Sequence, residues 1–181
     1  MKTAAIFAAL GLIAAAGSAA AQTGIVAIPS GTNTLMFTAF RRWCLDVPPN
    51  FDALDGRATS AHLRVSGDNK VTQPDGSKVE TKTWFYATGP ANYAISAVKA
   101  VQGGQTMSAC NVYSGSLADA NMVDFLSQET QFGKPLQQST NGDRTLWNGP
   151  FPNTAIRLDL RNSGQSYEGV LTIMQTAEPG K

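Results

Sequence analysis

The stretch Asn92–Tyr113, with the sequence NYAISAVKAVQGGQTMSACNVY, decides the fold. Its segments 92–101 and 105–113 flank the pair Gly103-Gly104. A glycine pair between two strand-forming segments is typical of a β-hairpin, because the tight turn needs positive φ angles. Side chains alternate along a strand, so Cys110 shares one face of the second strand with Thr106, Ser108 and Val112. We therefore predict an antiparallel hairpin that carries a cysteine on one face.

Two helices are expected ahead of this hairpin, over residues 34–46 and 51–64. Pro48-Pro49 ends the first helix, because the residue before a proline resists the helical conformation. Asn50 can cap the start of the second helix with its side-chain oxygen. The apolar residues of the first helix recur at helical spacing and form one stripe, which consists of Met36, Phe40, Trp43, Cys44 and Val47. Cys44 is therefore expected on the buried side of its helix.

Residues 1–21 have the features of a secretory signal peptide. Lys2 precedes the short apolar run Ala4–Ala16, and Ala19-Ala20-Ala21 is a small-residue cleavage site. The run is too short to span a bilayer, which needs about 20 apolar residues. We expect cleavage after about Ala21, a periplasmic or secreted location, and no membrane span in the mature chain.

Cys44 and Cys110 are predicted to form one structural disulfide. Two cysteines in an exported chain suit such a bridge, because the compartment is oxidising. The bridge would join the first helix to the sheet. The competing interpretation is a reactive thiol, which would need its pKa lowered by a neighbouring cation such as Arg41 or Arg42. We favour the structural bridge.

The rest of the chain is expected to form strands and one further helix. Two short strands are expected within 136–148 around Asn141-Gly142, and further strands over 78–87, 156–161 and 167–173. A helix is expected over 117–132, and residues 66–69 would end the second helix. The predicted order is α-α-β-β-β-α-β-β-β. Because tightly connected strands pair antiparallel, we predict an α+β fold: an antiparallel β-sheet of about five to six strands with three helices packed on one face. Residues 22–33 would be an irregular leader, 34–176 a single α+β domain, and 177–181 a frayed tail.

The charge balance gives no reason to expect a nucleic-acid partner. The full chain has 14 Lys and Arg against 13 Asp and Glu. Loss of Lys2 with the signal peptide would leave equal numbers of positive and negative side chains. Neither phosphate backbones nor anionic lipids attract a chain of balanced charge.

The sequence offers no constellation that points to a catalytic site, a metal or a cofactor. His62 is the only histidine, and we expect it at the surface of the second helix. A hydrolytic triad would have to use His62, for which a surface role is the simpler interpretation, and a zinc site needs more His and free Cys ligands than this chain supplies. The acids Asp46, Asp52 and Asp55 cluster in the sequence, but Asp52 falls in the first turn of a helix, where it complements the helix dipole. We therefore name no catalytic residue, no metal ligand and no cofactor.

Four residues are candidates for binding. Trp147 and Phe151 lie in the stretch 147–153 among Gly, Pro and Asn, where aromatic rings can stack a ligand or anchor a partner. Alternatively, Trp147 ends a strand and fills the core, which is the role we favour. Arg57 and Arg64 could share a face of the second helix and hold an anion, although a solvated polar face is the simpler interpretation.

Several short motifs resemble a group of small uncharacterised exported proteins of alphaproteobacteria. They lie along most of the mature chain: Phe40-x-x-x-Cys44-Leu45, Trp84, Ser108-Ala109-Cys110-Asn111-Val112, Gly133-Lys134-Pro135 and Thr145-Leu146-Trp147. The resemblance implies the cell envelope as the compartment and a pair of bonded cysteines. It carries over no catalytic residue.

Three functions are compatible with these observations. The leading hypothesis is a non-catalytic binding or interaction protein of the cell envelope, whose partner is a protein or a small molecule. The second is a small hydrolase that uses carboxylate or lone-serine chemistry. The third is a proteinaceous inhibitor of an envelope enzyme, which would present the aromatic loop 147–153.

Overall fold

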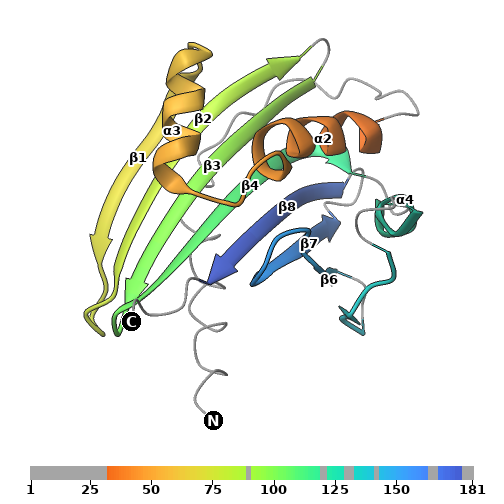
Figure 1. The fold of residues 1–181 in the computed structure, drawn as a ribbon. Helices are drawn as coiled ribbons and strands as arrows, with labels where there is room; N and C mark the ends of the chain where they lie inside the picture. The colour runs from red at the N-terminus through yellow and green to blue at the C-terminus, as the bar shows by residue number, and fades with distance from the viewer. Residues whose placement is uncertain are drawn as a thin grey trace.

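One antiparallel β-sheet with helices packed on one of its faces makes up the fold (Figure 1). The computed structural model describes residues 32–88, 91–118, 122–128, 133–140, 143–162 and 167–176. The predicted signal peptide, most of the predicted leader and the predicted tail lie outside these residues. The helices are α2 (Thr32–Phe40), the π-helix η2 (Arg41–Leu45), α3 (Phe51–Ser60) and α4 (Met122–Gln128). The strands are β1 (Arg64–Thr72), β2 (Lys78–Thr88), β3 (Ala91–Gln102), β4 (Gln105–Ala118), β5 (Gln137–Gln138), β6 (Arg144–Asn148), β7 (Thr154–Asn162) and β8 (Tyr167–Thr176).

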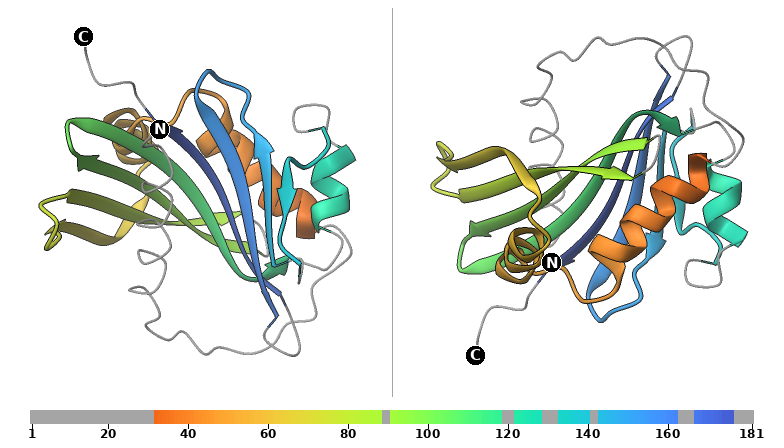
Figure 2. Two further views of the ribbon diagram at one scale, coloured as in Figure 1. Left: turned by 90° about the horizontal axis from the view of Figure 1, so that it is seen from below. Right: turned by 90° about the horizontal axis from the view of Figure 1, so that it is seen from above.

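The sheet has eight strands in the order β1-β2-β3-β4-β8-β7-β6-β5. The prediction of an antiparallel sheet with helices on one face is therefore right in outline, and its count of five to six strands is wrong. The predicted element order differs in part, because it lacks β1 and has three strands after the third helix where the structure has four. The two short strands predicted within residues 136–148 are β5 and β6. Figure 2 shows α2 and α3 crossing the same face of the sheet, which we call the helix face. We call the opposite face the open face.

The hairpin β3–β4 forms as its glycines predict. Gly103 and Gly104 both have positive φ, 57° and 80°, and Gln102 pairs with Gln105 across the turn. An L-residue with a side chain would be strained at both glycine positions. β4 runs on to Ala118, so the helix predicted over 117–132 is shorter: the described part of that region has α4 only from Met122 to Gln128.

The first predicted helix is confirmed with altered bounds. It begins at Thr32 rather than at residue 34, and it continues from Phe40 as the π-helix η2. Its apolar stripe is buried at Met36, Phe40, Trp43 and Cys44, whereas Val47 is 40% exposed. The stripe therefore covers the sheet along α2 and η2 and ends there.

α3 ends four residues earlier than the predicted bound of residue 64, because His62 closes it. Asn50 caps the start as expected, and its Oδ1 accepts from Ala53 N at 2.9 Å. At the other end, His62 has φ 55°, its N–H bonds to Thr59 O, and Leu63 N–H bonds to Ala58 O at 2.9 Å. These two bonds form the Schellman arrangement, in which the left-handed residue stops the helix. Arg64 therefore lies on β1, and it does not share a helix face with Arg57.

β1 runs through residues 66–69, which the sequence predicts as the end of the second helix. Its register with β2 pairs Val65 with Trp84 and Gly67 with Thr83, with a β-bulge between Val65 and Gly67. All of its residues except Gly67 are exposed, as suits an edge strand. Gly67, Asp68 and Asn69 are typical of helix ends and loops, but here pairing with β2 satisfies their backbone groups.

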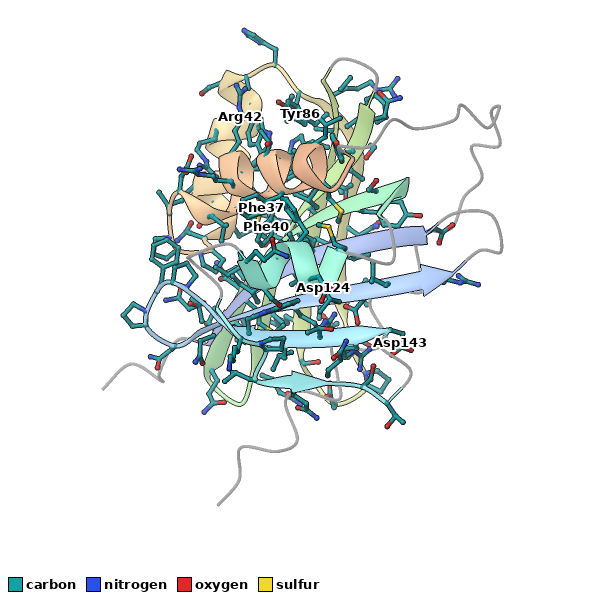
Figure 3. The ribbon with its side chains drawn as sticks, turned by 90° about the vertical axis from the view of Figure 1, so that its right-hand side faces the viewer. Phe37, Phe40, Arg42, Tyr86, Asp124 and Asp143 are labelled. Carbon is teal, nitrogen blue, oxygen red and sulfur yellow. A yellow bond between two sulfur atoms is a disulfide. The ribbon has the colours of Figure 1, made fainter. Side chains whose placement is uncertain are left out.

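The core lies between the helices and the sheet. Phe37 of α2, which Figure 3 labels, meets Phe125 of α4 edge to face, with ring centroids 5.9 Å apart. The largest fully buried side chains come from both layers and are Phe40, Met36, Met122, Leu126, Trp84, Tyr93, Ile95, Trp147, Ile156, Leu158, Leu171 and Ile173. The helix face is therefore the apolar face over the middle of the sheet.

Candidate functional site

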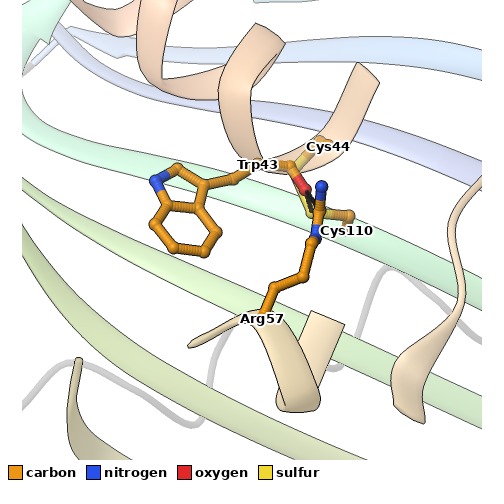
Figure 4. Close-up of a disulfide and its surroundings, with 4 residues drawn as sticks. All are labelled: Trp43, Cys44, Arg57 and Cys110. Carbon is orange, nitrogen blue, oxygen red and sulfur yellow. Dashed lines mark hydrogen bonds between the residues drawn. A yellow bond between two sulfur atoms is a disulfide. The ribbon is translucent and has the colours of Figure 1, made fainter. Parts of the chain in front are cut away.

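The disulfide fixes the end of the first helix to the centre of the sheet. Cys44 and Cys110 are bonded, with their Cα atoms 5.5 Å apart, and both are almost fully buried (Figure 4). Cys44 belongs to η2 and Cys110 to β4, so the bridge is the predicted link between helix and sheet. Both sulfur atoms are in this bond, so the alternative of a reactive free cysteine is not supported.

The backbone carbonyl of Trp43 lies beside this bridge and is held by Arg57. The Arg57 guanidinium of α3 donates to Trp43 O, and the same oxygen lies 3.7 Å from Sγ of Cys110 (Figure 4). Carbonyls at a helix end lack partners within the helix, so a side-chain donor stabilises them. Arg57 therefore caps the end of η2 from the neighbouring helix.

Aromatic rings and arginines gather around Trp43, and we call Arg42, Trp43, Arg57, Tyr86 and Tyr93 the Trp43 cluster. The rings of Trp43 and Tyr86 meet edge to face at 5.5 Å, and Tyr86 stacks with Tyr93 at 6.3 Å. The Arg42 guanidinium lies 5.7 Å from the centre of Trp43 and 5.9 Å from that of Tyr86. Figure 3 shows Arg42 and Tyr86 close together beside the first helix. The cluster therefore joins η2 and α3 to the ends of β2 and β3.

Three hydrogen-bond donors of the Trp43 cluster have no partner among the described residues. They are Nε1 of Trp43, Nε of Arg57 and the hydroxyl of Tyr93, and all three atoms are buried. Buried donors almost always bond to protein, water or ligand, so each unpaired one requires an explanation. In Figure 4 the Trp43 indole nitrogen lies on the edge of the ring that is directed away from Arg57. The unpaired nitrogens of Trp43 and Arg57 therefore do not point at one common position.

The electrostatics of the cluster are positive. No acid in the described ranges forms an ion pair with Arg41, Arg42 or Arg57. Burial raises the pKa of Tyr93 to about 12, and the nearby Tyr86 adds to this rise. The Tyr93 phenol therefore stays neutral and keeps its donor proton at physiological pH.

Of the residues proposed from the sequence for binding, the structure brings only Arg57 into this cluster. Arg64 starts β1, and its guanidinium lies 5.3 Å from the ring centre of Phe85 on the open face. The prediction that Arg57 and Arg64 share a face is therefore wrong, because α3 ends before Arg64.

Trp147 and Phe151 do not form an exposed aromatic pair. Trp147 belongs to β6 and is fully buried in the core, which agrees with the packing role favoured from the sequence. Phe151 is half-buried in a tight loop, where Thr154 Oγ1 donates to its carbonyl at 2.6 Å. Gly149 has to be glycine here, because a Cβ would lie 2.1 Å from Thr154 Oγ1. An inhibitor that presents Trp147 from this loop is not supported by this packing.

The other polar residues considered from the sequence have structural surroundings. Asp55 of α3 pairs with Lys82 of β2 at 2.7 Å, which ties the helix to the sheet. Asp52 lies in the first turn of α3, and His62 closes the same helix. Asp46 follows η2 directly, and among the described residues the three clustered acids form no group that could hold a metal ion.

A shallow surface depression lies away from the Trp43 cluster. It opens near the tips of the β1–β2 and β3–β4 hairpins, and Lys70, Lys78, Lys99 and Glu80 line it together with apolar residues. Lys70 already pairs with Glu80. We place the candidate site at the Trp43 cluster instead, because that cluster contains buried hydrogen-bond donors without acceptors among the described residues.

Sequence reasoning missed Arg42, Tyr86 and Tyr93, and it assigned Trp43 to the core stripe alone. A partial pattern was present: Tyr86 alternates onto the same face as Trp84, which is the face that the helices cover. The unpaired donors could not be foreseen, because they depend on how the rings meet across three elements.

No protein-family model, curated protein or solved structure matches this chain. Its resemblance to exported alphaproteobacterial proteins stays an expectation. Within the described ranges, no three or more His, Cys, Asp or Glu are grouped to hold a metal ion. None of the described helices has the length and apolar character needed to cross a membrane.

Proposed function

We propose that this chain is an exported binding protein of the cell envelope, and that the Trp43 cluster binds the carboxylate of an organic acid. The ligand is a small molecule or an acidic group of a partner protein. The periplasmic or secreted location follows from the predicted signal peptide, and the Cys44–Cys110 disulfide supports it because such bridges persist in oxidising compartments.

The observation that carries this proposal is a set of buried donors beside a cation, none of which has an acceptor or acid partner among the described residues. Nε1 of Trp43 and the hydroxyl of Tyr93 are buried donors without acceptors in the described part of the chain. The exposed Arg42 lies above the adjoining rings of Trp43 and Tyr86. A carboxylate supplies acceptors for the donors and a counter-charge for the guanidinium.

The rigidity of the site also supports binding. The disulfide and the Arg57 hydrogen bond fix the peptide of Trp43, so the ring positions are set before a ligand arrives. Preorganised groups lose less conformational freedom on binding, which raises affinity. The exposed face of the half-buried Tyr86 can also stack with a ring of the ligand.

The test is a titration of the processed, oxidised chain with benzoate, which combines a carboxylate with a ring. Nitrogen-15 NMR resolves the indole groups of Trp43, Trp84 and Trp147, and a Trp43→Phe variant assigns the first. We expect benzoate to shift the Trp43 indole resonance and to leave the other two in place. Native mass spectrometry of the same protein, purified from periplasm without reductant, should show a retained acidic ligand.

Matched arginine variants separate this site from general positive charge. Arg42→Gln should weaken benzoate binding at least about tenfold, because a charged hydrogen-bond partner is lost. Arg41→Gln removes the same charge from an exposed neighbour that contacts no ring among the described residues, and it should bind as the wild type does. Equal losses in both variants, or no shift of the Trp43 resonance at tens of millimolar benzoate, would contradict the proposal.

A further inference from the structure

The surface depression near the tips of the β1–β2 and β3–β4 hairpins has a volume of about 270 Å³. Figure 1 shows the two tips side by side at the lower end of the sheet, below α3. Alternation along the strands from Trp84, which the helices cover, places most of the lining on the helix face. Those lining residues are Lys70, Thr72, Lys78, Glu80, Lys99 and Val101. The depression therefore occupies a part of the helix face that the helices do not cover.

Lysines dominate the charge of this depression. It contains three of them and the single acid Glu80, which leaves an excess of two positive charges. The register places Glu80 directly between Lys70 on β1 and Lys99 on β3, and Glu80 forms its ion pair with Lys70. Neither Lys78 nor Lys99 forms an ion pair with an acid of the described ranges. Two cations of the depression therefore lack a counter-charge.

The acids around the depression are directed to other groups. Lys82 is the next lysine along the helix face of β2; it lies opposite Asp68 in the register and pairs with Asp55 of α3 at 2.7 Å. Asp75, in the β1–β2 turn, accepts a hydrogen bond from Nε2 of Gln102 at 2.9 Å. This bond ties the two hairpin tips together and so holds the walls of the depression in place.

We infer that this depression is a second binding site, and that it takes the dianionic phosphate group of a phosphomonoester or of inorganic phosphate. Lys78 and Lys99 supply counter-charges for this group, whose charge is about −1.5 to −2 at pH 7. Lysine is a common phosphate ligand, because its ammonium group is a point charge with three hydrogen-bond donors. Val71, Val79 and Val101 complete the lining, and apolar walls strengthen the local field.

The size of the depression suits a phosphate group rather than a whole large ligand. Its volume of about 270 Å³ lies just below the roughly 300–1,000 Å³ of pockets that enclose drug-sized molecules. The rest of a larger phosphomonoester would therefore stay in solvent. The balanced charge of the whole chain does not oppose such a site, because salt screens exposed charges that lie more than about 8–10 Å away.

The experiment is a titration of the processed, oxidised chain with sodium phosphate, followed by nitrogen-15 NMR at constant ionic strength. At about pH 7.5 phosphate is mostly dianionic, and we expect saturable shifts of the Lys78 and Lys99 backbone resonances. Sodium chloride in its place should not produce them. Glucose 1-phosphate separates the two sources: tighter binding than that of inorganic phosphate assigns the site to a phosphomonoester, and weaker binding assigns it to free phosphate.

Charge variants test the site in both directions. Lys78→Gln and Lys99→Gln should each weaken phosphate binding at least about threefold, because each removes one counter-charge. Glu80→Gln should strengthen it at least about threefold, because it removes the acid that competes for the lysines. Lys134→Gln is the matched control: Lys134 is exposed, as Lys78 is, but it lies outside the depression and its variant should bind as the wild type does.

The outcomes distinguish a built site from general positive charge. Losses in the two lysine variants together with a gain in Glu80→Gln support the inference, provided that circular dichroism shows the variants folded. Equal effects of Lys99→Gln and Lys134→Gln overturn it, as does the lack of a saturable shift at tens of millimolar phosphate. The Trp43 indole resonance reports on the other site, so a failure here is distinguished from a failure of benzoate binding.

Discussion

Arg57 donates a hydrogen bond from its guanidinium to the backbone carbonyl of Trp43. This bond links α3 to the end of η2 at the point where the Cys44–Cys110 bridge links η2 to β4. One peptide unit is therefore held by a covalent link from the sheet and by a polar link from a helix. Since Trp43 carries the rings and donors of the candidate site, both links should influence stability and binding together.

Arg57→Met tests the polar link. The variant keeps an apolar stem but leaves the Trp43 carbonyl without its donor, so we expect a loss of about 1–3 kcal/mol in the free energy of unfolding. Urea unfolding followed by circular dichroism measures it. Arg64→Met is the control, because Arg64 is exposed and contributes only a ring contact worth about 0.5–1 kcal/mol. Equal losses in the two variants would show that the carbonyl does not need Arg57.

The double variant Cys44→Ala/Cys110→Ala tests the covalent link. The bonded residues are separated by 66 positions in the sequence. In the chain-entropy model, a loop of this length stabilises the fold by about 4 kcal/mol. We expect the urea midpoint to fall accordingly, and the benzoate-induced shift of the Trp43 resonance to weaken because the ring is less firmly placed. An unchanged midpoint would contradict the role of the bridge.

His62→Gly should stabilise the chain, against the usual effect of glycine. His62 has φ 55° and closes α3, a backbone conformation that glycine adopts more easily than residues with a side chain. We expect a gain of roughly 0.5–1 kcal/mol in the free energy of unfolding. Thr59→Gly is the comparison, because it puts glycine in the last turn of the helix and should destabilise by about 0.3 kcal/mol. A loss in His62→Gly would show that the imidazole makes a contact worth more than the strain.

The predictable part of the fold came from strongly patterned segments. Gly103-Gly104 marked the hairpin, and Asn50 marked the start of α3. β1 was missed because it is an edge strand with little burial, so its side chains do not alternate between apolar and polar. The extent of α3 was missed because its stop is a histidine rather than a glycine, and backbone geometry rather than residue type ends it.

The candidate site was predictable only in fragments. Arg57 was named, but for a helix face that it was expected to share with Arg64. Trp43 was recognised as apolar, but a periodic pattern cannot show that its indole N–H lacks an acceptor. Contacts such as Trp43 with Tyr86 join residues far apart in the sequence, and a single sequence carries no direct trace of such pairs.

Trp147→Ala and Phe151→Ala test whether the aromatic residues of β6 and of the loop after it pack in the core or are exposed for a partner. Trp147 is fully buried, so its truncation should cost about 3–5 kcal/mol. Phe151 is only half-buried, so its truncation should cost clearly less. Thermal or urea unfolding of the two variants gives the comparison. A mild effect at Trp147 would contradict its placement in the core and would reopen the proposal that this loop is presented to a partner.

The pH dependence of stability should report the burial of Tyr93. Its pKa is raised to about 12 in the folded chain by burial, with Tyr86 adding to the rise, whereas an unfolded tyrosine has a pKa of about 10. Below pH 10 both states keep the proton, and the burial does not change stability with pH. Between about pH 10 and 12 the unfolded state releases the proton first, so the folded state loses stability as the pH rises, by up to about 1.4 kcal/mol per pH unit.

Tyr93→Phe isolates this contribution. Phenylalanine keeps the ring contact with Tyr86 and removes the hydroxyl that finds no acceptor in the described chain, so stability at pH 7 should change little. Urea unfolding at intervals from pH 9 to 11.5 should show a steeper decline for the wild type than for the variant. Burial and the nearby Glu168 also raise the pKa of Tyr113, but this tyrosine is present in both proteins, so its effect cancels in the difference. Parallel curves would mean that Tyr93 ionises as readily in the folded chain as in the unfolded one, and the hydroxyl would then have to be open to solvent.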